Sequence, residues 1–303
     1  MIRTLRLSDI PRQLLPNRLN SNDLVSTYSR ISEKGKMLRP LELGIWTLPI
    51  PRNRKAIGSF HNNHLQALLL LQSRQHKSVW EISHAFSNTA GYGELDELII
   101  AGARVAASGG AERIFMRSPL ASPADGPATR TGFKHAFKEN LLRGTLSSTG
   151  VRSLALQKLQ PTDLHGLYRL HVAVVPQKIK PAIGMNLEQW LAARENSIGH
   201  VQEYIWNIDS EIRAWLRINW LSKSIVIDSF IHPEYSSRTD DFIETAYRIV
   251  GYKTKVHWIV RNHEVTIANA LNSRGWSVDN SFEVLIKPIA KFAHQTSMLP
   301  VQV

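Results

Sequence analysis

Two glycines occur where the chain leaves one predicted strand and enters a predicted helix, within Asn88-Thr89-Ala90-Gly91-Tyr92-Gly93. Glycine lets the backbone come close to a ligand, and the free N–H groups at a helix N-terminus attract anions. This stretch could therefore hold a phosphate group. The alternative is a plain turn between a strand and a helix, because Gly-x-Gly alone is a weak pattern.

Two carboxylates on predicted strands, Glu81 and Asp228, are candidates for a general base. Glu81 follows Trp80, and an apolar neighbour of this kind can raise the pKa of a carboxyl group. The alternative for both residues is an ordinary polar side chain on the face of a strand.

Several other chemistries lack the residues that they need. The chain has no Cys, which excludes disulfides, thiolate nucleophiles and Cys-based metal sites. Its twelve His residues show no i, i+4 pairing with a carboxylate, so we expect no metal site. No Gly-x-Ser-x-Gly signature of a serine nucleophile is present.

The elements around these candidates occur twice in the same order. Ser78–Ser83 is repeated as Ser224–Ser229, and Gly132-Phe133 is repeated as Gly275-Trp276, each at an offset of about half the chain. Each half reads as strand–helix, a meander, and then helix–strand–helix–strand. The repeat indicates a duplicated domain.

The apolar pattern predicts strands at Val79–Phe86, Arg113–Arg117 and Phe133–Arg143, the last of which would close the first half. Glu94–Ala107 carries apolar residues at three- and four-residue spacing, which predicts a helix. Gly58–His64 is expected to be a turn.

Trp215 and Trp220 lie five residues apart on one predicted strand. Side chains alternate between the faces of a strand, so these two must point to opposite faces. One of them could line a groove or a domain interface.

The chain has 303 residues and a net charge of +12, a balance that favours nucleic acid or another anionic partner. The densest basic stretch, 30–55, can also be a solvated loop with three prolines. No apolar run approaches the roughly 20 residues of a membrane span, and no secretory signal is visible. We therefore expect a cytoplasmic protein.

The order of elements resembles the Gcn5-related N-acetyltransferase (GNAT) fold. The resemblance rests on the opening at 5–10, the strand–loop–helix at 79–107, and the helix, Gly-aromatic, strand units at 122–143 and 263–286. It implies an α+β protein of two tandem GNAT-like domains, 1–150 and 151–303, each with a mixed twisted sheet flanked by helices. A linker rich in Ser, Thr and Gly would join them.

In proteins of this family a Gly-containing turn holds the pyrophosphate of acetyl-CoA. The resemblance places that turn at Asn88, Ala90, Gly91, Tyr92 and Gly93. Val79–Phe86 and Arg113–Arg117 would be adjacent parallel strands that separate where the cofactor enters.

The second half has no glycine in the corresponding segment, 232–241. Glu234, Asp240 and Asp241 would repel phosphates there, and Arg238 is the one compensating charge. We therefore expect acetyl-CoA in the first domain only.

The tyrosine that these enzymes commonly use as a general acid is replaced by Ala128 in the first half and by Leu271 in the second. Two hypotheses follow. The chain is an N-acyltransferase that uses acetyl-CoA on a small amine or a protein, with Glu81 as the base. Alternatively, it is an inactive module that binds nucleic acid or a larger assembly through its basic surface.

Overall fold

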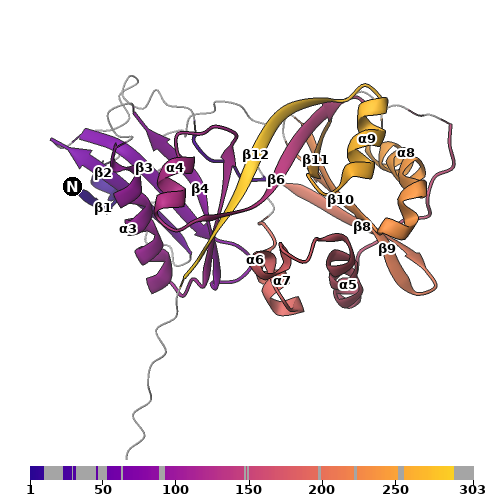
Figure 1. Ribbon diagram of the computed structural model, residues 1–303, viewed down its shortest axis with the longest axis horizontal. Coiled ribbons are helices and arrows are strands. Elements are labelled where there is room, and N and C mark those ends of the chain that lie inside the picture. The colour runs from indigo at the N-terminus through magenta and orange to yellow at the C-terminus, as the bar shows by residue number, and fades with distance from the viewer. Residues whose placement is uncertain are drawn as a thin grey trace, which may run out of the picture.

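One twisted sheet runs through the whole molecule and carries helices on both faces (Figure 1). The computed structural model describes residues 1–9, 23–28, 30–31, 46, 53–62, 64–88, 93–146, 148, 150–196, 199–221, 224–251 and 256–289. No helix among these residues is long and apolar enough to cross a membrane.

The sheet contains twelve strands in the described residues. They are β1 (Ile2–Thr4), β2 (Arg54–His61), β3 (His64–Ser73), β4 (Val79–Ser87), β5 (Arg113–Pro119), β6 (Lys134–Gly144), β7 (Gln157–Lys158), β8 (His200–Ile208), β9 (Glu211–Trp220), β10 (Ile225–Ile231), β11 (Val256–Arg261) and β12 (Ser277–Pro288).

The described α-helices connect these strands, and three short 3₁₀ helices accompany them. The α-helices are α3 (Leu95–Ser108), α4 (Asp125–Arg130), α5 (Leu164–Val174), α6 (Lys180–Ile183), α7 (Leu187–Ala193), α8 (Thr239–Val250) and α9 (Val265–Ser273). The 3₁₀ helices are η1 (Leu7–Asp9), η3 (Pro161–Asp163) and η4 (Pro233–Arg238).

The two halves exchange their last strands. The order of the sheet is β1-β2-β3-β4-β5-β12-β6-β11-β10-β9-β8-β7, so β12 from the end of the chain pairs with β5, and β6 pairs with β11. Figure 1 shows β6 and β12 crossing the middle of the molecule side by side. The order is symmetric: β1 to β5 from one end correspond to β7 to β11 from the other, and the exchanged strands lie between them. This symmetry agrees with a duplicated domain.

This exchange corrects one sequence prediction. The strand expected at Phe133–Arg143 exists as β6, but it does not close the first half, because its neighbours are β11 and β12 of the second half. The strands before and after the predicted linker, β6 and β7, belong to the same sheet.

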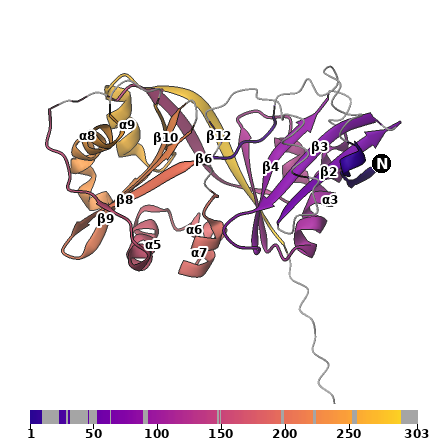
Figure 2. The same cartoon turned by 180° about the vertical axis from the view of Figure 1, so that it is seen from behind.

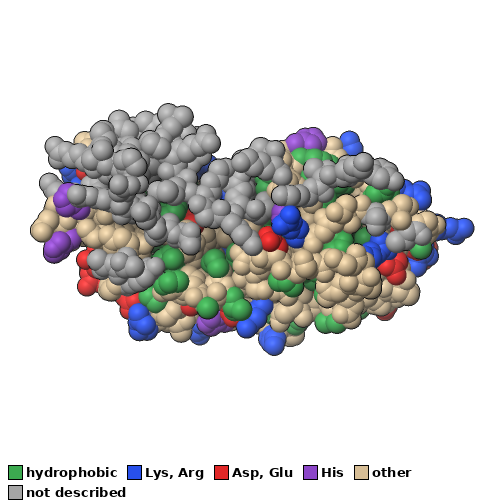
Figure 3. All heavy atoms as spheres, turned by 90° about the horizontal axis from the view of Figure 1, so that it is seen from above, with side chains coloured by type: hydrophobic (Ala, Val, Ile, Leu, Met, Phe, Trp, Pro, Cys, Tyr) green, Lys and Arg blue, Asp and Glu red, His purple; other side chains and the backbone are tan. Residues whose placement is uncertain are grey.

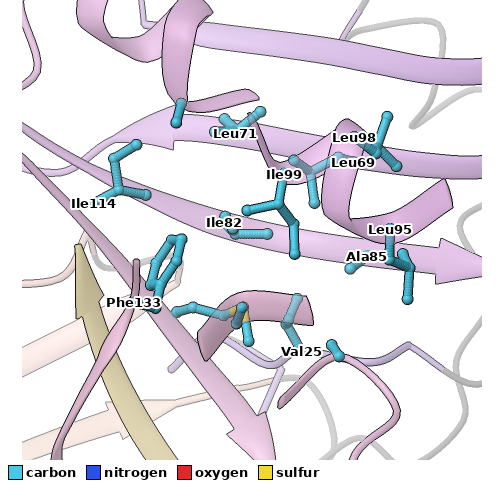
Figure 4. Close-up of a cluster of buried hydrophobic side chains, with 14 of the residues drawn as sticks. Val25, Leu69, Leu71, Ile82, Ala85, Leu95, Leu98, Ile99, Ile114 and Phe133 are labelled. Atoms are coloured by element: carbon cyan, nitrogen blue, oxygen red, sulfur yellow. The ribbon is translucent and has the colours of Figure 1, made fainter. Parts of the chain in front are cut away.

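The core of the first half lies between the sheet and α3. Figure 4 shows Leu98 and Ile99 of this helix close to Leu69 of β3, and Leu95 close to Ala85 of β4. The expected helical face of α3 is therefore buried. The cluster holds a layer of helix against a layer of sheet in this half.

The second half is covered on both faces, as the view from behind also shows (Figure 2). α8 and α9 pack on one face of the sheet, where Trp220 joins their apolar cluster, and α5 and α7 pack on the other, where Trp215 lies. The prediction that these two tryptophans point to opposite faces is confirmed.

The turn expected at Gly58–His64 was misplaced. Gly58 lies inside β2, and the chain reverses at residues 61–64. A Cβ atom at Gly58 would come within 2.6 Å of Leu65 and 2.8 Å of Leu5, so glycine permits close packing here instead of a turn.

Candidate functional site

The parallel strands β4 and β5 separate toward their carboxyl ends, as the sequence analysis predicted. Their pairing begins at Val79↔Arg113 and ends at Ile82↔Met116, although β4 continues to Ser87 and β5 to Pro119. The opening between the strands, which we call the first crevice, is where the resemblance places the cofactor.

A β-bulge at Ser83 lies where this separation begins. Leu71 of β3 pairs with Ile82, whereas Leu70 pairs with His84, so Ser83 is one extra residue on β4. Its hydroxyl donates a hydrogen bond to the Leu70 carbonyl at 3.2 Å. A bulge bends its strand and increases the local twist. The β9–β10 pair of the second half shows no such shift of register.

The chain itself fills the first crevice. The Leu24 N–H donates to the Ala85 carbonyl at 2.8 Å, and the Ala85 N–H donates to Asp23 Oδ1 at 3.0 Å. On the other side, the Ser26 N–H donates to the Arg117 carbonyl at 2.8 Å. Residues 23–26 therefore use main-chain groups on both strands that an inserted ligand would need.

Side-chain packing fixes this segment in place. Leu24 and Val25 are 5% and 2% exposed and belong to the core of the first half. Figure 4 shows Val25 among the same buried side chains as Leu95 and Ala85. The hydroxyl of Ser122 also donates to the Leu24 carbonyl at 3.0 Å. The segment is thus part of the hydrophobic core.

Asp23 adds a buried charge to the segment. Its carboxylate lies 2.7 Å from Arg30 Nη1 and accepts the Ala85 N–H. Burial raises the pKa of Asp23 to about 6, and these two donors oppose the shift only in part.

This shift makes docking of the segment depend on pH. A raised pKa in the folded state gives stability that is present below the unfolded value of 3.8 and is lost as pH rises through about 6. We expect the free energy of unfolding of the wild type, relative to Asp23→Asn, to fall by about 2 kcal/mol from about pH 4 to about pH 7.

Urea denaturation of both proteins across this range measures the difference. The buried histidines titrate in both proteins, so their contribution cancels. A pH-independent difference would show that Asp23 is not buried as described.

The predicted phosphate turn lies mostly outside the described residues, which include Asn88 and Gly93 but not Ala90, Gly91 or Tyr92. The Asn88 amide donates to the Gln66 side chain at 2.5 Å. A Cβ atom at Gly93 would meet nothing within 4 Å. The cofactor assignment of these five residues stays a prediction.

Glu81, the predicted base, is buried and already holds two donors. Gln72 Nε2 lies 2.6 Å from its carboxylate, and Arg74 Nε lies 2.9 Å from it. Burial raises the pKa of Glu81, while Arg74 opposes this shift. Arg74 also pairs with Glu195, so these contacts connect Glu81 to a cluster of buried charged residues that includes Arg117 and Glu195. They do not connect it to Asn88 or Gly93.

The positions expected for a general acid offer no proton. Ala128 and Leu271 are both fully buried in the hydrophobic cores of their halves. In the second half, the carboxylates at the start of α8 already bind arginines: Asp241 lies 2.5 Å from Arg238, and Asp240 lies 2.8 Å from Arg274.

The charged cluster lies around a cavity of about 100 Å³ between the two halves, which we call the central cavity. Arg117 Nε lies 2.7 Å from Glu139, and its Nη2 lies 2.5 Å from Glu195. Arg261 holds Asp228, the second candidate base, at 2.8 Å. Burial alone would raise the pKa of Glu195, but Arg117 and Arg74 outweigh it and lower the pKa to about 2.

Sequence reasoning missed both the crevice segment and this cluster. The segment lies in a polar stretch without periodicity, which carries no signal. A signal for the cluster did exist, because Arg117 and Arg261 each follow three apolar residues on a strand, where an unpaired charge would be costly.

No family model and no curated protein matches the sequence. Among solved structures, a GCN5-related N-acetyltransferase from Sphaerobacter thermophilus aligns with a TM-score of 0.56 and 12% identity over 96% of each chain. A putative acetyltransferase from Pyrococcus horikoshii aligns with a TM-score of 0.51 and 10% identity, over 96% of this chain and 89% of that one.

A conserved protein of unknown function from Staphylococcus epidermidis gives a TM-score of 0.51 and 10% identity, over 70% of this chain and 85% of that one. At these identities the likeness concerns the fold alone.

Proposed function

We propose that this chain, which has the Gcn5-related N-acetyltransferase fold in tandem, acts by binding a partner and not by acyl transfer. The observation that carries this proposal is the first crevice. Its Ala85 and Arg117 main-chain groups are paired with residues 23–26 of the same chain. A cofactor could enter only if this buried segment left the core.

The side chains support the same conclusion. General acid catalysis needs a side chain that can give a proton near the reacting group. Ala128 and Leu271 cannot do so, and Glu81 is engaged by Arg74 and Gln72.

The net charge of +12 favours an anionic partner, either nucleic acid or an acidic protein. On the face seen in Figure 3, Lys and Arg side chains form separate spots among other residues. Among the described residues this face shows no continuous basic patch, so we base the attraction on the net charge of the sequence.

A second candidate is an N-acyltransferase that moves an acetyl group from acetyl-CoA to an amine. The bulge at Ser83 favours it, because the bulge lies where the first crevice begins and has no counterpart between β9 and β10. The cofactor would then bind in the first half only, near Asn88 and Gly93, after residues 23–26 had moved.

Calorimetric titration with acetyl-CoA separates the two candidates. We expect no heat and no thermal shift for the wild type at millimolar ligand, because residues 23–26 fill the first crevice. Both signals report binding, since a ligand that binds the folded state must raise its stability. The variant Asp23→Ala/Leu24→Ala weakens the segment and should behave in the same way. Leu154→Ala, at a buried leucine of the second half, controls for general loss of stability.

Binding of acetyl-CoA by the wild type would contradict the proposal. Binding by the weakened variant alone would identify an acyltransferase that its own segment inhibits. For the partner, retention on RNA or an acidic protein should fall steeply between about 50 and about 500 mM salt.

A further inference from the structure

The central cavity is built from both halves and from both exchanged strands. The first half supplies Tyr28 and Arg117, β6 supplies Glu139, and the second half supplies His171 and Arg261. It therefore exists only in the assembled molecule. It is distinct from the first crevice, although Tyr28 lies two residues after the segment 23–26 that fills that crevice.

Two arginines of this cavity keep N–H groups that their hydrogen bonds to carboxylates do not use. Arg117 uses three of its five N–H groups on Glu139 and Glu195, and the other two have no acceptor in the part of the chain that the structure describes. Arg261 uses three of its five N–H groups on Asp228 and Glu264, and its Nε lies 3.7 Å from Glu139 Oε1. An anion with free acceptor oxygens would use the remaining N–H groups.

The lining itself carries more positive than negative side chains. It includes five arginines and three carboxylates. Three further carboxyls pair with these arginines from outside the lining: Glu81 with Arg74, Glu264 with Arg261, and Glu203 with Arg194. Burial raises the pKa of Glu81 and of Glu264, the latter to about 7, so these two bind protons more readily than exposed acids do.

Two buried polar side chains of the lining have no partner among the described residues. They are the Tyr28 hydroxyl and both ring nitrogens of His171, in residues that are 6% and 3% exposed. Burial raises the pKa of Tyr28 and lowers that of His171 to about 3, so both side chains are neutral at pH 7. Each can then donate one hydrogen bond. Buried groups of this kind normally bond to water or to a ligand.

Aromatic rings form the remaining wall. Trp215 stacks on Phe230 at 5.2 Å between ring centroids, and His171 lies 5.4 Å from Trp190. These faces suit an apolar group. A volume of about 100 Å³ admits several waters or one small organic molecule.

We propose that the central cavity binds a small organic carboxylate. Its carboxylate group accepts hydrogen bonds from Arg117, Arg261 and the Tyr28 hydroxyl, and its apolar part lies against Trp190, Trp215 and Phe230. The site goes beyond the proposed partner binding and needs no acetyl-CoA.

The test is a thermal-shift and calorimetric titration of the intact chain with acetate, butyrate and benzoate. Butyramide, which has nearly the shape of butyrate without its charge, and inorganic phosphate are the controls. We expect saturable stabilisation by butyrate or benzoate and none by butyramide or phosphate. Tyr28→Phe should weaken carboxylate binding roughly two- to tenfold, the effect of one hydrogen bond.

Tyr204→Phe is the matched control, because Tyr204 bonds to Gln202 on β8 and does not line the cavity. It should bind as the wild type does. The proposal is overturned if no carboxylate binds the folded protein, if butyramide or phosphate binds as tightly as butyrate, or if Tyr28→Phe binds butyrate as the wild type does. A crystal structure with butyrate that shows only ordered water in the cavity would also overturn it.

Discussion

Neither half of the chain should fold when it is produced alone. Residues 1–150 would keep β5 but lose β12, which pairs with it from Phe282↔Pro119 to Pro288↔Arg113. Residues 151–303 would lose β6, the partner of β11. Each half would then expose a long apolar sheet edge, which favours aggregation. We expect each half to lack a cooperative thermal transition in circular dichroism.

The two halves made together should form one complex, because each can receive the strand that it lacks. The control is an intact chain with a protease site at residue 150, cut after folding. It should stay associated and unfold in one transition. A half that melts cooperatively alone would contradict the exchange and would support the predicted division into 1–150 and 151–303 as independent domains.

Replacement of Arg117 by methionine should cause the largest loss of stability among the single substitutions considered. Methionine keeps much of the volume but leaves Glu139 and Glu195 buried, 2% and 8% exposed, without their main cation. Breaking a buried ion pair from one side costs about 3–5 kcal/mol. For a chain of this size we expect the melting temperature to fall by roughly 5–15 °C.

Arg130→Met is the matched control. Arg130 also makes two hydrogen bonds to one carboxylate, Asp96, but its side chain is 63% exposed. Exposed pairs contribute little to stability because water and salt screen them. Equal changes in melting temperature for the two variants would show that the central cluster is solvated.

Local patterns in the sequence predicted most elements of the fold but not all of their partners. The helical spacing at Glu94–Ala107 identifies α3, because one buried face suffices to define it. The apolar pattern of Phe133–Arg143 identifies β6 equally well. The pattern does not reveal that β6 pairs with β11 of the second half, because a strand shows the same alternation whichever neighbour it pairs with.

The candidate site was harder to predict for the same reason. Gly91 and Gly93 attract attention because glycine has a recognisable backbone role, whereas Asp23-Leu24-Val25-Ser26 has ordinary residues and no repeat. Its position depends on hydrogen bonds to Ala85 and Arg117, far away in the sequence. Main-chain contacts of this kind leave almost no trace in composition.

The most direct test of the closed crevice is amide hydrogen exchange of the intact chain, with and without millimolar acetyl-CoA. The Leu24, Ser26 and Ala85 amides donate hydrogen bonds inside the crevice, so they should exchange as slowly as the core amides of β4, and acetyl-CoA should leave them unchanged. Fast exchange of Leu24 and Ser26, or a change at Ala85 on addition of acetyl-CoA, would contradict the account and show that the crevice is open to a cofactor.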